Sequence, residues 1–223
     1  MTTLVLTRDE RIHLAGILSH FVKWDPQAII RILTKERTLG ILADAPMGVL
    51  VFVALPLAEK PTETIDRGVS AHRLRDAIGD PSGPSARIGA ASLKLPDERG
   101  LLPSLAAMPS RDGWIPAEKA TAGEVKAALD TALAEFQRRV EAVEDATDER
   151  KQQLAREWWA EPSWGGLPLK ALHAAGLLGM LAFSGARIES ATRAGWKRLV
   201  SPAGQVFVAP PTSYSGIALS VVK

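Results

Sequence analysis

The feature that most constrains the fold is a hairpin-like pattern near the C-terminal end of the sequence. Residues 195–200 are Gly-Trp-Lys-Arg-Leu-Val, residues 205–209 are Gln-Val-Phe-Val-Ala, and Ser-Pro-Ala-Gly stands between them. Apolar and β-branched runs around a Pro/Gly turn predict a β-hairpin, because Pro202 presets φ and Gly204 accepts φ > 0. A four-residue turn sets Val200 opposite Gln205 and Arg198 opposite Phe207.

Strand alternation then divides the side chains of this hairpin between two faces. One face carries Trp196, Arg198, Val200 and Phe207, and the other carries Lys197, Leu199, Val206 and Val208. Each face combines apolar groups with a cation. The hairpin is therefore either packed on both sides or presents an aromatic-basic face to a partner, and the sequence leaves both alternatives open.

The first 95 residues predict a mainly antiparallel sheet with two helices. Thr7 and Glu10 have the spacing of a capping box, and apolar residues at helical spacing continue to about Val22. A second, short helix starts at Ser70 and ends at Gly79. Strands are expected over residues 4–6, 28–33, 39–43, 49–57, 64–69 and 87–95.

Over the first 80 residues, the order of strand, helix, meander of strands and short helix resembles one domain of a DNA sliding clamp. The resemblance implies that fold for this part of the chain. It implies no activity, because one fold serves many functions. No internal repeat is apparent in the sequence.

The C-terminal half predicts long helices followed by the terminal hairpin. Thr121 and Glu124 repeat the capping-box spacing, and apolar residues at steps of three and four predict a helix over 125–143. The pattern breaks near residue 145 and restarts, and a further helix is expected from Pro168 to Ala182. A last strand is expected over 217–222.

These elements give an α+β protein with three parts. Residues 1–95 form a mixed sheet and helix domain, residues 96–120 form a surface connection, and residues 121–223 form a helical domain with the hairpin. The Pro- and Gly-rich connection is expected to pack over the surface through Leu101, Leu102, Leu105 and Trp114. If the hairpin completes the N-terminal sheet, the whole chain is one domain.

Composition excludes several classes of chemistry. The chain has 27 Lys and Arg against 25 Asp and Glu and no cysteine, so disulfides, thiolate catalysis and Cys-ligated metals are excluded. It contains no P-loop, no Gly-x-Gly-x-x-Gly and no Gly-x-Ser-x-Gly. We therefore expect no cofactor, no metal and, on balance, no enzyme. With no signal-peptide pattern and no apolar run of about 20 residues, the expected location is the cytoplasm, away from membranes.

The basic groups favour a non-enzymatic binding or regulatory protein. Cations contact phosphates and aromatic rings stack on bases, so a basic-aromatic cluster predicts contact with DNA or RNA. The candidate residues for that contact are Arg187, Arg193, Trp196, Lys197 and Arg198.

Two other hypotheses remain open at this point. The 125–143 helix predicts a protein–protein adaptor or homo-oligomeric scaffold if its apolar stripe is exposed. The residues of that stripe are Leu129, Leu133, Phe136 and Val140. The third hypothesis is a small-molecule enzyme, which would need a pocket at His72, His173 or the cluster of Trp158, Trp159 and Trp164, together with a buried carboxylate.

Overall fold

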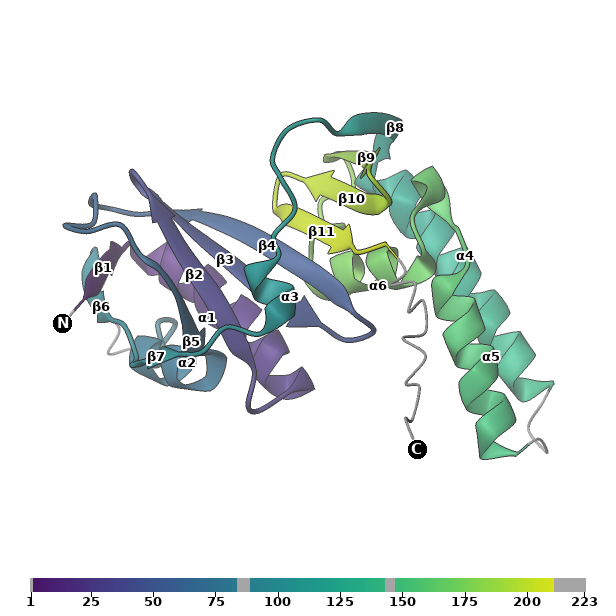
Figure 1. Cartoon of the computed structure of the whole chain (residues 1–223), viewed down its shortest axis with the longest axis horizontal. Helices are drawn as coiled ribbons and strands as arrows, with labels where there is room; N and C mark the ends of the chain where they lie inside the picture. The colour runs from purple at the N-terminus through teal and green to yellow at the C-terminus, as the bar shows by residue number, and fades with distance from the viewer. Residues whose placement is uncertain (1, 84–88, 143–146, 211–223) are drawn as a thin grey trace, which may run out of the picture.

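The computed structural model describes residues 2–83, 89–142 and 147–210, and it confirms the predicted α+β class (Figure 1). Its strands are β1 (Thr3–Leu6), β2 (Ile29–Lys35), β3 (Thr38–Ala45), β4 (Val49–Pro56), β5 (Asp66–Ser70), β6 (Ala91–Lys94), β7 (Glu98–Arg99), β8 (Ile115–Thr121), β9 (Arg187–Arg193), β10 (Trp196–Ser201) and β11 (Gly204–Val208). Its helices are α1 (Arg8–Trp24), α2 (Ala71–Ile78), α3 (Pro103–Ala106), α4 (Ala122–Glu141), α5 (Asp148–Ala160) and α6 (Leu169–Leu177), with a 3-10 turn, η1, at Trp164–Gly166.

One antiparallel sheet runs through both halves of the chain. Its strand order is β7-β5-β2-β3-β4-β11-β10-β9-β8, while β1 and β6 form a separate pair. The hairpin strand β11 joins the N-terminal sheet by pairing with β4, where Val206 lies opposite Val51. The terminal hairpin thus completes the N-terminal sheet, because β5, β2, β3 and β4 share one set of ladders with β11, β10, β9 and β8.

The topology contains a repeat that the sequence does not show. The order β5-β2-β3-β4 on one side of the sheet is mirrored by β8-β9-β10-β11 on the other. Each half has a strand, a capped helix and three antiparallel strands: β1-α1-β2-β3-β4 and β8-α4-β9-β10-β11, the second interrupted by α5, η1 and α6. Both helices begin with a complete capping box, at Thr7 with Glu10 and at Thr121 with Glu124.

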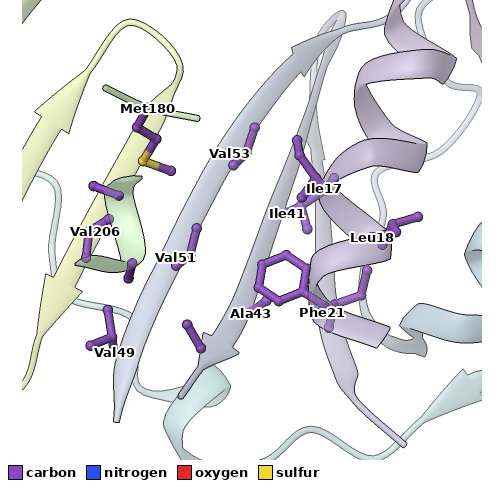
Figure 2. Close-up of a cluster of buried hydrophobic side chains, with 14 of the residues drawn as sticks. Ile17, Leu18, Phe21, Ile41, Ala43, Val49, Val51, Val53, Met180 and Val206 are labelled. Carbon is purple, nitrogen blue, oxygen red and sulfur yellow. The ribbon is translucent and has the colours of Figure 1, made fainter. Parts of the chain in front are cut away.

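The main hydrophobic core lies between the sheet and the helices on one of its faces. Figure 2 shows Ile17 and Phe21 of α1 close to Ile41 of β3, with Val51 of β4 between this group and Val206. All five side chains are buried. Removing this apolar surface from water is the dominant force that holds α1 on the sheet.

The opposite, outer face of the sheet is crossed by residues 96–114, which we call the connector. Its short helix α3 lies in front of the strands in Figure 1. Leu105 of α3 is fully buried in a second cluster with Leu42, Leu50 and Phe207. Arg31 holds the helix in place by donating from Nη1 to the Leu105 carbonyl oxygen at 2.9 Å.

The hairpin register is the one that the turn length predicts. Val200 pairs with Gln205 and Arg198 pairs with Phe207. The expected strand over 217–222 lies outside the described residues.

Other boundaries differ from the prediction. The last helix ends at Leu177 instead of Ala182, because Gly179 takes a left-handed φ of 72° in the turn that follows. The 96–120 connection holds three elements, and its last part is the edge strand β8, whose Ile115 is 68% exposed. An exposed edge strand has no apolar alternation, so periodicity did not reveal it.

Candidate binding surface

The hairpin places its cations on two different faces. Lys197 lies on the helix side, where Nζ donates to the carbonyl oxygen of Gly166 in η1. Its neighbours on that side, Leu199 and Val206, are buried in the main core. Lys197 is therefore separated by the sheet from the other four residues of the predicted nucleic-acid set.

Arg198 lies on the outer face beneath the connector. Its guanidinium carbon is 4.4 Å from the centroid of the Trp114 ring, a cation–π geometry. Trp114 is held by its Nε1, which donates to the Ser110 carbonyl oxygen at 2.9 Å, and its ring lies 5.9 Å from that of Phe207. The Arg198 Nε is buried and finds no acceptor within the described part of the chain. Burial lowers the pKa of Arg198, and the charge of Glu189 opposes that shift.

Arg193 lies on the same face as Arg198. It packs under Gly113, the connector residue that precedes Trp114. Gly113 has φ 78°, and a Cβ atom added there would stand 3.4 Å from the Arg193 Nε. The glycine thus allows the connector to pass close over the arginine. Arg193 Nη1 is also buried without an acceptor among residues 2–83, 89–142 and 147–210.

The remaining residues of the predicted set have different surroundings. Arg187 is on the outer face, where its Nε lies 3.1 Å from Glu189, and Glu189 also contacts Lys119 at 3.4 Å. Trp196 pairs with Arg193 across the strands and packs against the second cluster. On the outer face, Arg193, Trp196 and Arg198 therefore lie close together, while Arg187 lies at the other end of β9 and is paired with Glu189.

A hollow of about 280 Å³ opens between the connector and the hairpin, and we call it the connector pocket. Its lining residues are Phe52, Met108, Pro109, Ser110, Arg111, Trp114, Arg198, Gln205 and Phe207. A second hollow of about 340 Å³ shares Phe52, Met108 and Arg111 with it and continues along the outer face toward Lys35. In the described ranges, Arg111, Arg193 and Arg198 form no ion pair with a carboxylate.

The predicted partner stripe on α4 is partly covered. Leu129 is buried, and Leu133, Phe136 and Val140 are half-buried. Phe136 stacks on Trp158 of α5 with ring centroids 6.0 Å apart. The helix α5 therefore covers the middle of the stripe, and Figure 1 shows α4 and α5 side by side.

The open part of the stripe forms a groove between α4 and α6. It has a volume of about 350 Å³ and is lined mainly by apolar side chains, among them Leu129, Leu133, Leu177 and Leu181. His173 also lines it, with its ring 4.8 Å from that of Trp159, and burial lowers the pKa of this histidine. Leu177 at the rim is 43% exposed, and Phe183 just beyond it is 77% exposed.

Of the residues proposed for an enzyme site, His173 and Trp159 are in ring contact, while His72 lies apart from them on α2. His72 Nδ1 lies 3.0 Å from Asp76 on α2, with both side chains about half exposed. No Asp or Glu is buried among the residues that the structure describes. The same residues contain no group of three or more His, Asp or Glu placed to hold a metal ion. None of the described helices combines the length and apolar character needed to cross a membrane.

Comparisons with known proteins identify the fold. A family model described as a domain of unknown function, DUF8185, matches residues 109–213. Among curated protein sequences, none matches this chain.

Solved structures similar to this chain include DNA polymerase sliding clamps. That of Pseudomonas aeruginosa is 10% identical with a TM-score of 0.56, and the alignment covers 94% of this chain and 64% of the clamp. The polymerase III β subunit of Caulobacter crescentus is 11% identical with a TM-score of 0.59, covering 93% and 64%. That of Bartonella birtlesii, bound to griselimycin, is 12% identical with a TM-score of 0.58, covering 94% and 65%. The chain thus has a sliding-clamp fold over almost its whole length and spans a little under two thirds of each clamp.

Several residues of this surface were not singled out from the sequence. The expectation that the connection packs over the surface is confirmed for Leu101, Leu105 and Trp114, while Leu102 is 45% exposed. Arg111, Phe52 and Gln205 carried no signal, because their meeting depends on how β4, β11 and the connector come together.

Proposed function

We propose that this protein is a non-enzymatic, nucleic-acid-associated binding protein with a clamp-type fold. Its contact surface is the outer face of the three strands β9, β10 and β11, together with the connector. The observation that carries the proposal is the group of three arginines near Trp114, namely Arg111, Arg193 and Arg198, which form no ion pair with a carboxylate within the described part of the chain. Two of them hold buried N–H groups without acceptors in the described structure.

Physical chemistry favours an anionic partner at such a surface. An arginine remains charged when partly buried, and its planar fork matches a phosphate. Leaving a buried N–H without an acceptor is costly, and a phosphate oxygen would relieve that cost. The similarity to DNA polymerase sliding clamps adds support for DNA over RNA. The proposal keeps the cytoplasmic location expected from the sequence.

Fluorescence anisotropy tests the proposal with labelled single- and double-stranded DNA and RNA at two salt concentrations. We expect salt-sensitive binding that weakens at least tenfold in Arg193→Ala/Arg198→Ala, because each lost phosphate contact reduces both affinity and salt dependence. The matched control is Lys197→Ala, which removes a cation from the same strand on the opposite face. Absence of binding at low salt, or equal losses in Lys197→Ala and the double variant, would overturn the proposal.

A second candidate function is a protein–protein adaptor or homo-oligomeric scaffold. The observation in its favour is the apolar groove between α4 and α6, with Leu177 at its rim. Light scattering and partner capture with Leu177→Glu test it. If an assembly forms through this groove, the charged variant abolishes it while nucleic-acid binding is retained.

A further inference from the structure

The connector pocket has walls suited to a flat, partly polar ring. Phe52 and Phe207 of the sheet and Trp114 of the connector supply aromatic surface, while Gln205 supplies an amide that both donates and accepts hydrogen bonds. Its volume of about 280 Å³ is close to the lower limit of pockets that hold small molecules, about 300 Å³. Such a site accommodates one ring system rather than a folded partner.

Two arginines line the same pocket, and no carboxylate lines it among the described residues, although the charge of Glu189 acts on Arg198 from outside the pocket. Arg198 stacks on Trp114 and leaves its Nε without an acceptor in the described structure, while Arg111 forms part of the connector wall. Asp66 lines only the neighbouring hollow and is already paired with Arg31 at 2.7 Å. The pocket therefore combines aromatic surface with positive charge that forms no ion pair in the described structure, which is the combination that single-stranded nucleic-acid sites use.

The connector covers part of the pocket, and this favours the entry of an unpaired base over a base in a duplex. The connector residues Met108, Ser110 and Trp114 form one wall, so the hairpin face is not open along its length. A base inside a duplex is stacked and paired, and it would have to be extruded before its ring could enter. An unpaired base enters without that cost.

We infer that the connector pocket binds one unpaired base of a single-stranded nucleic acid, with the adjoining phosphates on Arg198 and Arg111. This inference rests on the proposed function and specifies its ligand. The base stacks on the aromatic walls, and Gln205 contacts its polar edge. Duplex nucleic acid binds the same cations only through its backbone.

Competition anisotropy with matched oligonucleotides tests the inference. The probes are a labelled ten-nucleotide single strand, the same sequence as a duplex, and the single strand with abasic spacers in place of its central bases. We expect the base-containing single strand to bind about tenfold tighter than the abasic one, within the range measured for stacking of one base. The duplex is expected to bind at least fivefold more weakly than the single strand.

Two variants connect the effect to the pocket. Gln205→Glu places a carboxylate in the pocket with Arg198 while preserving the side-chain size, and we expect it to abolish the difference between base-containing and abasic strands. Trp114→Leu removes the aromatic wall, and its thermal melting curve shows whether the connector still folds. Photocrosslinking of a 5-iodouracil strand, followed by peptide mapping, is expected to label Trp114 or its pocket neighbours. Lys197→Ala is the matched control and leaves the preference unchanged.

The outcomes separate this inference from the proposed function. Salt-sensitive binding with no preference for single strands, no loss on abasic substitution and no effect of Gln205→Glu would overturn the pocket inference and leave the proposed function standing. Absence of binding to every probe at low salt would overturn both. Crosslinks confined to α1 and α2 would reject the pocket and move the contact to the opposite side of the sheet.

Discussion

The N-terminal unit β1-α1-β2-β3-β4 and the C-terminal unit β8-α4-β9-β10-β11 share one order of elements but differ in how their ends are arranged. In the first unit, β1 leaves the large sheet and pairs with β6. In the second, β8 stays in the sheet and pairs with β9, and α5, η1 and α6 are inserted before the three strands. The two units meet at the β4–β11 ladder.

The two units also differ in how their faces are covered. The α1 layer closes its half of the core with large buried side chains such as Phe21 and Leu18. The insertion in the C-terminal unit leaves the α4–α6 groove, and the connector beside its hairpin leaves the connector pocket. The second unit therefore has an apolar groove and borders a basic-aromatic pocket, while the hollows on the first unit lie beside Lys35 and beside His72.

The largest expected effect tests whether the two units unfold as one. Phe21→Ala and Leu172→Ala each remove a buried side chain, one from each unit, and each is expected to cost about 3–4 kcal/mol. Because β4 and β11 share a ladder, both variants should lower the midpoint of a single urea transition. Two separate transitions, each moved by only one variant, would contradict a shared sheet.

A smaller effect distinguishes two adjacent glycines found only in the C-terminal unit. Gly165 has φ 63°, and a Cβ there would collide with the buried Ser190, whereas at Gly166, with φ 67°, nothing lies within 4 Å. Gly166→Ala is therefore expected to cost about 1 kcal/mol for its backbone conformation. Gly165→Ala adds overpacking of about 1–3 kcal/mol. Equal losses in urea denaturation would show that Ser190 can move aside.

The two capping boxes offer a direct comparison between the units. Thr7→Ala and Thr121→Ala each remove the hydroxyl that accepts from the third residue of the helix, and each is expected to cost about 1 kcal/mol. Thr131→Ala is the control, since its hydroxyl donates to the Ala127 carbonyl inside α4, and it should change stability by less than about 0.5 kcal/mol. A large difference between the two cap variants would mean that one helix is held by packing alone.

The smallest expected effect is on the pH dependence of stability, to which His173 and Asp66 contribute in different pH ranges. Burial lowers the pKa of His173 below its usual value near 6.5, so the unfolded chain binds more protons and stability falls as the pH drops below about 6.5. The hydrogen bond from Arg31 lowers the pKa of Asp66, so its contribution is present above about pH 4 and is lost below that value. Each contribution is about 0.5 kcal/mol, because both groups are partly solvated.

Urea midpoints measured between pH 3 and 8 check both groups. His173→Gln should flatten the curve between pH 5 and 7, and Asp66→Asn should flatten it only below pH 4. If His173→Gln leaves the curve between pH 5 and 7 unchanged, the histidine is solvated in the folded protein as it is in the unfolded chain.

Local elements could be predicted because their signals are contained in a few consecutive residues. The capping boxes at Thr7 and Thr121 and the turn around Pro202 and Gly204 each specify a local conformation, and the structure has all three. The edge strand β8 and the end of α6 could not be predicted. The first is stabilised by pairing with β9 and not by its own pattern, and the second depends on a turn at Gly179.

The sequence by itself determined the α+β class, the two helix caps, the hairpin register and the division of hairpin side chains between two faces. Only the tertiary structure decided what covers each face: η1 and the main core on the side of Lys197, and the connector on the side of Arg198. The physical reason is the separation in sequence between the residues that interact. Alternation and turn geometry act between neighbouring residues, whereas the pairing of β4 with β11 and the stacking of Trp114 on Arg198 join residues far apart in the chain, and only the complete set of packing contacts selects them.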